Sequence, residues 1–245
     1  RDLVRSRGLG DVYKRQRYYS KLRKRIIWKE IVQKQAMYRF FQVNRDIFFR
    51  TLCLVIVTMF FTSAGAAQGE VILAVNTLLM QLFTLFSYIM DGFAYAGEAL
   101  SGRYIGARNQ TGLHSTVRHL FYWGFGLSMV FTILYSVGGK EFLELLTNDV
   151  SVIKAADSYF YWALAIPLAG FSAFLWDGVF IGATATRQML YSMLVASASF
   201  FGVYYAFHSL LGNHALWLAF LVYLSLRGIV QTFLGRQIMK KVIVS

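Results

Sequence analysis

From residue 46 onward the sequence consists of long apolar stretches separated by short polar segments, and this pattern restricts the fold more than any other feature. Each stretch approaches the ~20 residues that a helix needs to cross ~30 Å of hydrocarbon. Backbone groups inside a bilayer must pair within their own segment, and no alternating strand pattern is present, so helices are expected. The predicted spans are 47–67, 71–96, 117–137, 155–181, 189–211 and 216–234. The predicted fold class is therefore an all-α membrane protein, a bundle of six transmembrane helices.

The composition supports the lipid bilayer as this chain's main partner. Of its 245 residues 57% are hydrophobic and only 15% are charged, whereas a soluble domain carries about 25% charged residues. The net charge of +13 is concentrated at one end, because residues 1–50 hold fifteen Lys or Arg against four acids, or +11. A basic segment directly before a hydrophobic run is typical of a cytoplasmic flank. This placement argues against nucleic acid as a partner.

Four regions are predicted along the chain. Residues 1–16, RDLVRSRGLGDVYKRQ, resemble a translated sequencing-adaptor read and are expected to be non-native, the alternative being a native basic tail. Residues 17–45 are basic and aromatic, and are expected to be a cytoplasmic linker, either solvated or forming an amphipathic helix at the interface. Residues 46–239 form the transmembrane lobe and residues 240–245 a cytoplasmic tail. Since the chain starts with Arg rather than Met, we expect it to be a fragment.

The charges of the short loops predict the orientation. The expected loop 98–119 carries Arg103, Arg108 and Arg118, whereas the alternate loops contain more acids than bases. Because cytoplasmic loops are enriched in Lys and Arg, both ends of this chain are predicted to be cytoplasmic. One of the opposite loops, 138–154, is expected to be either a short amphipathic segment or a plain surface loop.

Two aspartates lie within the apolar spans, and a glutamate lies just beyond the end of one of them. An ionised Asp at a helix centre costs roughly 2.5–3.5 kcal/mol on insertion scales, so such groups face an interior, a partner or water. Asp91 and Glu98 are seven residues apart, nearly two turns, and project from one helix face. Asp177 lies at a similar depth to Asp91, so the two are expected to share a cavity. We interpret all three as candidate proton- or cation-binding residues; the alternatives are a Glu98–Arg103 pair and a structural salt bridge of Asp177.

Arg227 is the clearest intramembrane cation of the sequence. Nothing in lipid pairs with a guanidinium, so we expect Arg227 to turn inward and form an ion pair with one of the aspartates. Small residues next to the acids predict close helix contacts, namely Gly92 with Ala96 and Gly178 with Gly182.

A substrate cavity is predicted from polar and aromatic side chains within the spans. The candidates are Asn76, Gln81, Tyr95 and Trp176. Aromatic rings attract flat organic cations by cation–π contact, and polar groups facing away from lipid line internal space. Packing or lipid contact remains the simpler interpretation of each residue.

Enzymatic chemistry finds no support in the motifs. HExxH, a GxGD pair of aspartates and a GxSxG nucleophile elbow are missing, and the four histidines lack metal-ligand spacing. The single cysteine, Cys53, excludes an intramolecular disulfide. We therefore expect neither an enzyme nor a cofactor or metal centre.

Three segments resemble the C-terminal lobe of the multidrug and toxic compound extrusion (MATE) family, in the DNA-damage-inducible protein F-like branch: NRDIFFRTLCLVIVTMFFTSAGA, DGFAYAGEALSGRYIGARN and FLWDGVFIGATATR. The resemblance covers about residues 17–244 and implies one half of a twelve-helix, pseudo-twofold antiporter in the bacterial cytoplasmic (inner) membrane. Such a protein exports organic cations, drugs or toxic metabolites by alternating access, driven by H⁺ or Na⁺. The implied partners are a cationic small molecule and a missing N-terminal six-helix lobe. The family's C-lobe carboxylates carry over onto Asp177, and more weakly onto Asp91 and Glu98.

Two other functions stay open at this stage. A lipid-linked oligosaccharide flippase of the same superfamily is expected to have a strongly basic cavity, and Arg227 alone provides little of one. A non-catalytic membrane subunit has no need of buried charges in its spans.

Overall fold

The computed structural model describes residues 34–241, and residues 1–33 and 242–245 lie outside the described part. The predicted non-native segment, most of the predicted linker and most of the C-terminal tail therefore fall outside it. The chain divides into two units, Arg1–Asn44 and Arg45–Ser245, and the fold presented below is that of the second unit.

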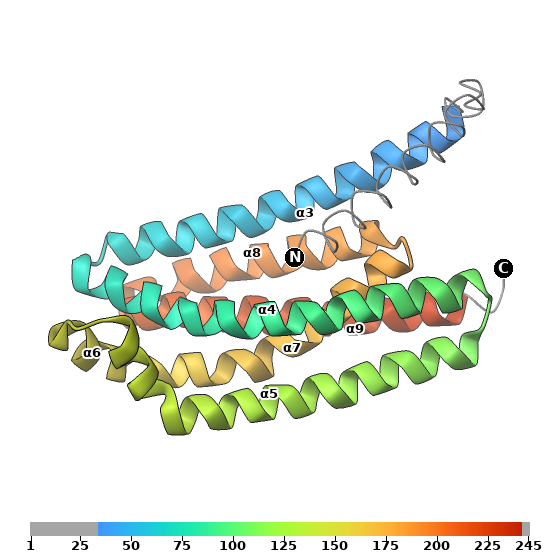
Figure 1. Ribbon diagram of the computed structural model, residues 1–245. Coiled ribbons are helices and arrows are strands. Elements are labelled where there is room, and N and C mark those ends of the chain that lie inside the picture. Colours follow the sequence, from blue (N-terminus) through green and yellow to red (C-terminus); the bar gives the residue numbers. More distant parts are fainter. Residues whose placement is uncertain (1–33, 242–245) are drawn as a thin grey trace, which may run out of the picture. The chain divides into compact units, whose positions relative to one another are not determined.

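Helices make up nearly all of the described part (Figure 1). They are α3 (Lys34–Ala66), α4 (Glu70–Gly106), α5 (Gln110–Leu146), α6 (Val150–Asp157), α7 (Phe160–Gly182), α8 (Thr186–Leu211) and α9 (Asn213–Lys241). All except the short α6 contain a stretch long and apolar enough to cross a membrane, which makes six candidate spans in residues 34–241. The predicted all-α fold with six spans is confirmed.

The helices extend beyond the predicted spans, so several predicted loops are wrong. Most of the expected loop 98–119 is helical, because α4 continues to Gly106 and α5 begins at Gln110. The side chain of Asn109 caps α5 by accepting a hydrogen bond from the backbone N of Gly112 at 2.8 Å. The expected segment 138–154 is divided between the end of α5 and the start of α6, and the fourth span begins at Phe160 rather than at residue 155.

Helix α7 lies at the centre of the bundle. It contacts α4, α5, α8 and α9, and its span has the largest buried share of the six. Helix α3 joins this core through aromatic rings: Phe61 packs edge-on against Trp217 of α9, with centroids 5.1 Å apart. Phe60 likewise meets Phe201 of α8 at 5.0 Å. The residues that line the core therefore come from every long helix.

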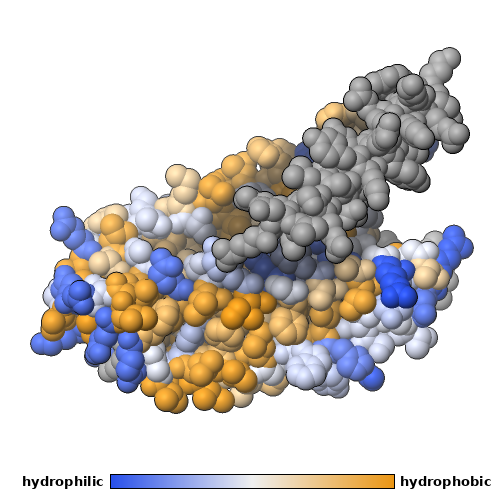
Figure 2. Space-filling view, in the orientation of Figure 1, coloured by the Kyte–Doolittle hydropathy of each residue, from blue (hydrophilic) through white to orange (hydrophobic). Residues whose placement is uncertain are grey.

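Apolar side chains also cover the outside of the bundle. Figure 2 shows hydrophobic residues across the middle of the visible face and hydrophilic residues toward its two ends. Trp123 and Val137, for example, are 69% and 77% exposed. An apolar surface of this extent needs lipid around it, because soluble proteins rarely expose large apolar patches. The chain is thus a multi-pass membrane protein.

Small residues bring α4 and α7 into backbone contact. A Cβ atom at Gly178 would overlap the carbonyl of Ala94, and one at Gly182 would overlap the hydroxyl of Ser101. This is the close packing predicted for Gly178 and Gly182. The corresponding contact at Gly92 is not formed within residues 34–241, where no atom lies within 4 Å of a Cβ built there. The contact of α4 with α7 is made instead by the face of α4 that carries Ala94 and Ser101.

Candidate functional site

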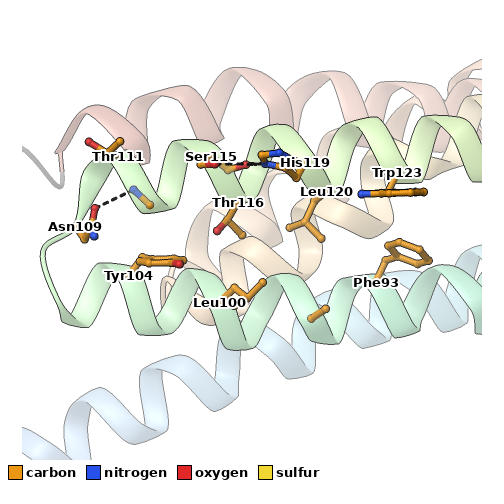
Figure 3. A pocket seen from close by; sticks show the side chains of 12 residues that line it. Phe93, Leu100, Tyr104, Asn109, Thr111, Ser115, Thr116, His119, Leu120 and Trp123 are labelled. Carbon is orange, nitrogen blue, oxygen red and sulfur yellow. Dashed lines mark hydrogen bonds between the residues drawn. The ribbon is translucent and has the colours of Figure 1, made fainter.

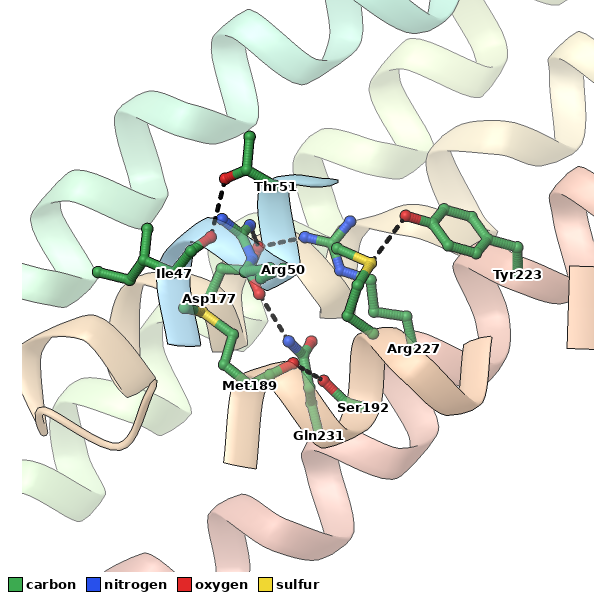
Figure 4. A network of polar contacts seen from close by, with 10 residues as sticks. Ile47, Arg50, Thr51, Asp177, Met189, Ser192, Tyr223, Arg227 and Gln231 are labelled. Atoms are coloured by element: carbon green, nitrogen blue, oxygen red, sulfur yellow. Dashed lines mark hydrogen bonds and ion pairs between the residues drawn. The ribbon is translucent and has the colours of Figure 1, made fainter. Parts of the chain in front are cut away.

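Asp177 lies buried between three helices, at the centre of a polar cluster (Figure 4). One carboxylate oxygen accepts hydrogen bonds from the guanidinium groups of Arg50 on α3 and Arg227 on α9. The other oxygen accepts a hydrogen bond of 2.6 Å from Nε2 of Gln231 on α9. Arg227 therefore turns inward, as the sequence led us to expect, and its partner is Asp177.

The local structure of α9 explains how two of these donors reach the same carboxylate. Arg227 and Gln231 are four residues apart, so they lie one above the other on the same helix face. Gly228 lets this face approach α7, because a Cβ atom there would lie 3.0 Å from Cβ of Ser172. The short separation of the two helices places both donors within hydrogen-bonding reach of Asp177.

Asp91 is the fourth charge of this region. It is half-buried on α4, and it lies close enough to Asp177, Arg227 and Arg50 to interact with their charges. No hydrogen bond or ion pair to its carboxylate is present within residues 34–241. With both aspartates ionised and both arginines protonated the four charges sum to zero, so the region is electrically balanced only while Asp91 is charged.

The cluster contains more polar atoms than its own hydrogen bonds satisfy. Nε of Arg50, Nε of Arg227 and Oε1 of Gln231 are buried, and none of them has a hydrogen-bond partner in the described part of the chain. An unpaired buried polar group costs about 1–3 kcal/mol. A network of charges with unpaired polar atoms is less stable than a fully hydrogen-bonded one. A rearrangement that pairs these atoms would therefore lower its free energy.

Glu98 and Tyr95, two further predicted site residues, lie along α4 beyond Asp91. Glu98 is half-buried, and the described residues show no ion pair between it and Arg103. Tyr95 is 70% exposed and forms part of the outer surface of the bundle. Neither residue contacts the Asp177 cluster directly, so any role for them involves a group outside the described residues or a passing ion.

Asn76 and Gln81 line a polar cavity of about 140 Å³ between α3 and α4, together with four threonines. Asn76 is itself buried and exchanges two hydrogen bonds with Asn213 of α9, at 2.8 and 2.9 Å. Its Oδ1 also accepts a hydrogen bond from Nε1 of Trp217, at 2.9 Å. Asn76 thus ties α4 to α9, whereas Gln81 is free to face the cavity.

Trp176 lies in the packed interior. Its Nε1 donates a hydrogen bond of 2.9 Å to the hydroxyl of Thr232 on α9, and its ring stacks on Phe180 at 5.7 Å. A Cβ atom at Gly235 would overlap the Trp176 ring, so α9 passes directly across the indole. Trp176 therefore fixes α7 against α9, and it does not line the cavity that contains Asn76 and Gln81.

Two residues of the cluster, Arg50 and Gln231, were missed by the sequence analysis. The signal for Arg50 was present, because a charge inside a predicted span always needs a partner. Gln231 carries no charge, and only its position one turn after Arg227 indicates the same face. A buried Asp46 was missed as well; it is 2% exposed, pairs with Arg45 at 3.1 Å and lies 3.5 Å from the hydroxyl of Thr186.

Comparison with known proteins identifies the family. Residues 47–207 match the family described as MatE. The chain is 40% identical over 191 residues to DNA damage-inducible protein F of Escherichia coli (strain K12), an alignment that covers 78% of this chain and 41% of that protein. It is 23% identical over 192 residues to Protein DETOXIFICATION 43 of Arabidopsis thaliana, covering 78% and 36% of the two chains.

The chain thus spans about two fifths or less of the length of these relatives. The matched region begins in α3 and ends in α8, so it includes Asp91, Asp177 and Arg50 of the charged cluster. The family is one of transporters rather than enzymes, which confirms the absence of enzymatic chemistry expected from the motifs. The three matching segments of the sequence, the six candidate spans and this alignment agree. The chain belongs to the MatE family of membrane transporters.

Proposed function

We propose that this chain is one six-helix lobe of a cation-coupled antiporter, which exports organic cations, drugs or toxic metabolites by alternating access. The observation that carries the proposal is the cluster of Asp177, Arg50, Arg227 and Gln231, with Asp91 within range of its charges. Charges inside a bilayer are costly and are retained where an ion or substrate passes. A second six-helix lobe completes the transporter, in keeping with the length of the relatives.

In this proposal the two aspartates have different tasks. Asp177 already accepts hydrogen bonds from two guanidinium groups and an amide, so a proton or Na⁺ at this carboxylate has to displace them. Asp91 has no such partner among the described residues, and it is the better site for the coupling H⁺ or Na⁺. Glu98, two turns further along the same face of α4, serves as a relay toward the end of the helix.

Binding of a cation at Asp91 then changes the balance of the whole cluster. The four charges sum to zero before binding, and to +1 afterwards. Arg50 and Arg227 lose part of the negative potential that holds them, and Asp177 alone has to compensate both. Since Arg50, Asp177 and Arg227 come from α3, α7 and α9, this change loosens the contact among three helices. That is a route by which one bound ion biases the lobe between two arrangements.

The substrate surface is assigned to polar and aromatic groups that the lobe leaves accessible. Gln81 faces the small cavity between α3 and α4, and Tyr95 presents an exposed ring that suits an organic cation. Asn76 and Trp176 support this surface from within, through their hydrogen bonds to α9. We propose that the second lobe supplies the opposite wall.

The proposed orientation in the bacterial inner membrane places both ends of the chain in the cytoplasm. The connection at residues 107–109 lies among Arg103, Arg108 and Arg118, and the arginine-rich side of a membrane protein is the cytoplasmic one. Six crossings return the chain to the side from which it started.

The flippase alternative is less well supported. Arg50 joins Arg227 in the charged cluster, which the sequence analysis did not recognise, but Asp177 and Asp91 neutralise both arginines. A cavity that holds a lipid-linked pyrophosphate needs an excess of positive charge. A non-catalytic subunit is also less well supported, since it gains nothing from a half-satisfied charge cluster.

The test uses the complete transporter, reconstituted in liposomes with a fluorescent organic cation as cargo. Asp177→Asn is expected to abolish ion-driven efflux, and Asp91→Asn to abolish coupling while leaving exchange of the dye in the absence of an ion gradient. Glu144→Gln is the matched control, because this exposed carboxylate lies outside the candidate spans. Efflux at the wild-type rate in both Asn variants refutes the assignment of the site.

A further inference from the structure

A groove of about 550 Å³ runs between α4 and α5, away from the Asp177 cluster (Figure 3). Its walls change character along its length. Near the connection between the two helices it is lined by polar groups, among them Tyr104, Ser115 and His119. Toward the middle of the bundle it is lined by Phe93, Leu120 and Trp123. A ligand that fits both parts has a polar end and an apolar body.

Exposed arginines are the sequence neighbours of residues that line the polar end of the groove. Arg103 and Arg118 are exposed on α4 and α5, and Arg108 is exposed in the connection. The guanidinium of Arg103 lies over the ring of Tyr104, 6.0 Å from its centroid, which places a cation beside a residue that lines the groove. Glu98, the nearest acid along α4, is not among the lining residues. This potential attracts an anion and repels the organic cations proposed as cargo.

Hydrogen-bonding groups without partners lie at the same end. Nδ1 of His119 donates to the carbonyl of Ser115 at 2.6 Å, which leaves Nε2 for a ligand. Tyr104 and Thr116 line the groove, and their hydroxyls make no hydrogen bond within residues 34–241. The groove therefore offers donors and acceptors for a polar headgroup next to the three arginines.

We propose that this groove binds an anionic phospholipid from the surrounding bilayer. The phosphate lies among Arg103, Arg108 and Arg118, and one acyl chain follows the apolar walls. The stripe from Tyr104 to Phe93 on α4 is about 16 Å long at a helical rise of about 1.5 Å per residue, enough to bury much of an acyl chain. Each buried methylene group adds to the affinity, and the arginines select the anionic headgroup. The orientation proposed above makes this a lipid of the cytoplasmic leaflet.

The experiment measures lipid binding to the purified complete transporter by native mass spectrometry. Phosphatidylglycerol and phosphatidylcholine with identical acyl chains are titrated separately, and inorganic phosphate is added in a third arm. We expect phosphatidylglycerol to bind more tightly, and each of Arg103→Gln, Arg108→Gln and Arg118→Gln to weaken it about fivefold. Phosphatidylcholine binding stays unchanged in these variants.

The matched control is Arg187→Gln. Arg187 is also exposed near a connection, and its guanidinium lies 5.9 Å from the ring centroid of Tyr191, the same arrangement as Arg103 over Tyr104, but away from the groove. Its replacement should leave phosphatidylglycerol binding at the wild-type level. A loss as large as that of Arg103→Gln means that the arginines act only through general surface charge, and overturns the proposal.

A second pair of variants tests the apolar part without touching the arginines. Ala96→Trp fills the groove and should reduce phosphatidylglycerol binding at least tenfold, whereas Ala198→Trp, at an exposed position of α8, should not. Unchanged binding in Ala96→Trp overturns the proposal. So does displacement of the lipid by inorganic phosphate alone, which identifies a phosphate site, or by the organic cation, which identifies a substrate site. If a variant no longer binds the lipid but still exports the dye, the lipid site and the proposed coupling site are independent. Each proposal can then fail without the other.

Discussion

Replacing Asp177 by asparagine removes the one negative charge that contacts both Arg50 and Arg227. The side chains of these arginines are only 19% and 5% exposed, so neither can recover its hydration where it lies. Removal of one partner from a buried ion pair typically costs about 3–5 kcal/mol, because the other charge stays buried and unpaired. We expect Asp177→Asn to lower the free energy of unfolding by this amount, with Arg227 accounting for most of it.

Removing Arg227 as well should restore part of the loss. The single variant leaves two arginines against Asp91, a net charge of +1, whereas Asp177→Asn with Arg227→Gln leaves Arg50 against Asp91, a net charge of zero. The double variant should therefore be about 1–3 kcal/mol more stable than Asp177→Asn alone. Combining Asp177→Asn with Arg50→Gln should restore less, because Arg50 is the more exposed of the two arginines.

The assay is reversible unfolding of the purified protein in mixed micelles by titration with a denaturing detergent. A double-mutant cycle isolates the interaction energy of the pair. The control cycle, Glu144→Gln with Arg187→Gln, changes two exposed charges outside the cluster and should stay within about 0.5 kcal/mol of the wild type. Strictly additive effects of Asp177→Asn and Arg227→Gln would refute the reasoning, since an ion pair in this position has to produce a coupling energy.

The remaining predictions concern helix packing and the cap of α6. Gly178→Ala should cost about 1–3 kcal/mol in the same unfolding assay, because the new Cβ overlaps the carbonyl of Ala94, whereas Gly126→Ala, which meets nothing within 4 Å, should be neutral or stabilise by up to about 1 kcal/mol. Equal effects contradict the packing described. Asp149 accepts hydrogen bonds from the hydroxyl and backbone N of Ser151, and these hold the pKa of its carboxyl below the usual value. A depressed pKa stabilises the folded state above the unfolded value of about 3.9, and this stabilisation is lost as the pH falls through the lower folded value. The protection of the first amides of α6 against hydrogen exchange, expressed relative to the exchange rate of an unstructured peptide at each pH, should fall in acid, and Asp149→Ala should show the low protection already at neutral pH.

Hydropathy was sufficient to predict the spans but not the ends of the helices. The six apolar stretches are long, and a bilayer leaves them no alternative to helix. Helix α4 nevertheless continues ten residues past the predicted end at 96, to Gly106, and includes Glu98 and Arg103. Charged residues end a hydrophobic stretch but do not end a helix, because a helix that leaves the membrane exchanges lipid for water without losing its backbone hydrogen bonds.

The more free energy a residue of the charged site would cost if it faced lipid, the easier it was to predict from the sequence. Asp177 and Arg227 stood out in apolar surroundings, and their pairing followed from the absence of any other partner. Arg50 lies just beyond the basic segment 1–45, so it was counted with the cytoplasmic flank, although it belongs to the buried cluster. Gln231 gave no signal of charge at all. Its role depends on the register of α9 against α7, which only the folded structure contains.

The polarity of a residue within a span did not show whether its side chain packs against another helix or lines a cavity. Asn76 and Gln81 had the same appearance in the sequence and both border the small cavity, yet the amide of Asn76 pairs with Asn213, 137 positions away, whereas Gln81 has no such partner within residues 34–241. A buried amide is stable when its partners are present, and the sequence does not say which distant residue provides them. The same limit applies to Trp176, which the sequence placed in a cavity and the structure places against Thr232.

The most direct test of the coupling proposal is a measurement of ion-driven accumulation and ion-independent exchange on the same liposomes. Asp91→Asn in the complete transporter is predicted to exchange labelled dye across the membrane at a rate close to that of the wild type, but to build up no gradient of dye when a gradient of H⁺ or Na⁺ is imposed. Wild-type accumulation of the dye by this variant would contradict the claim that a carboxylate beside the Asp177 cluster carries the coupling ion.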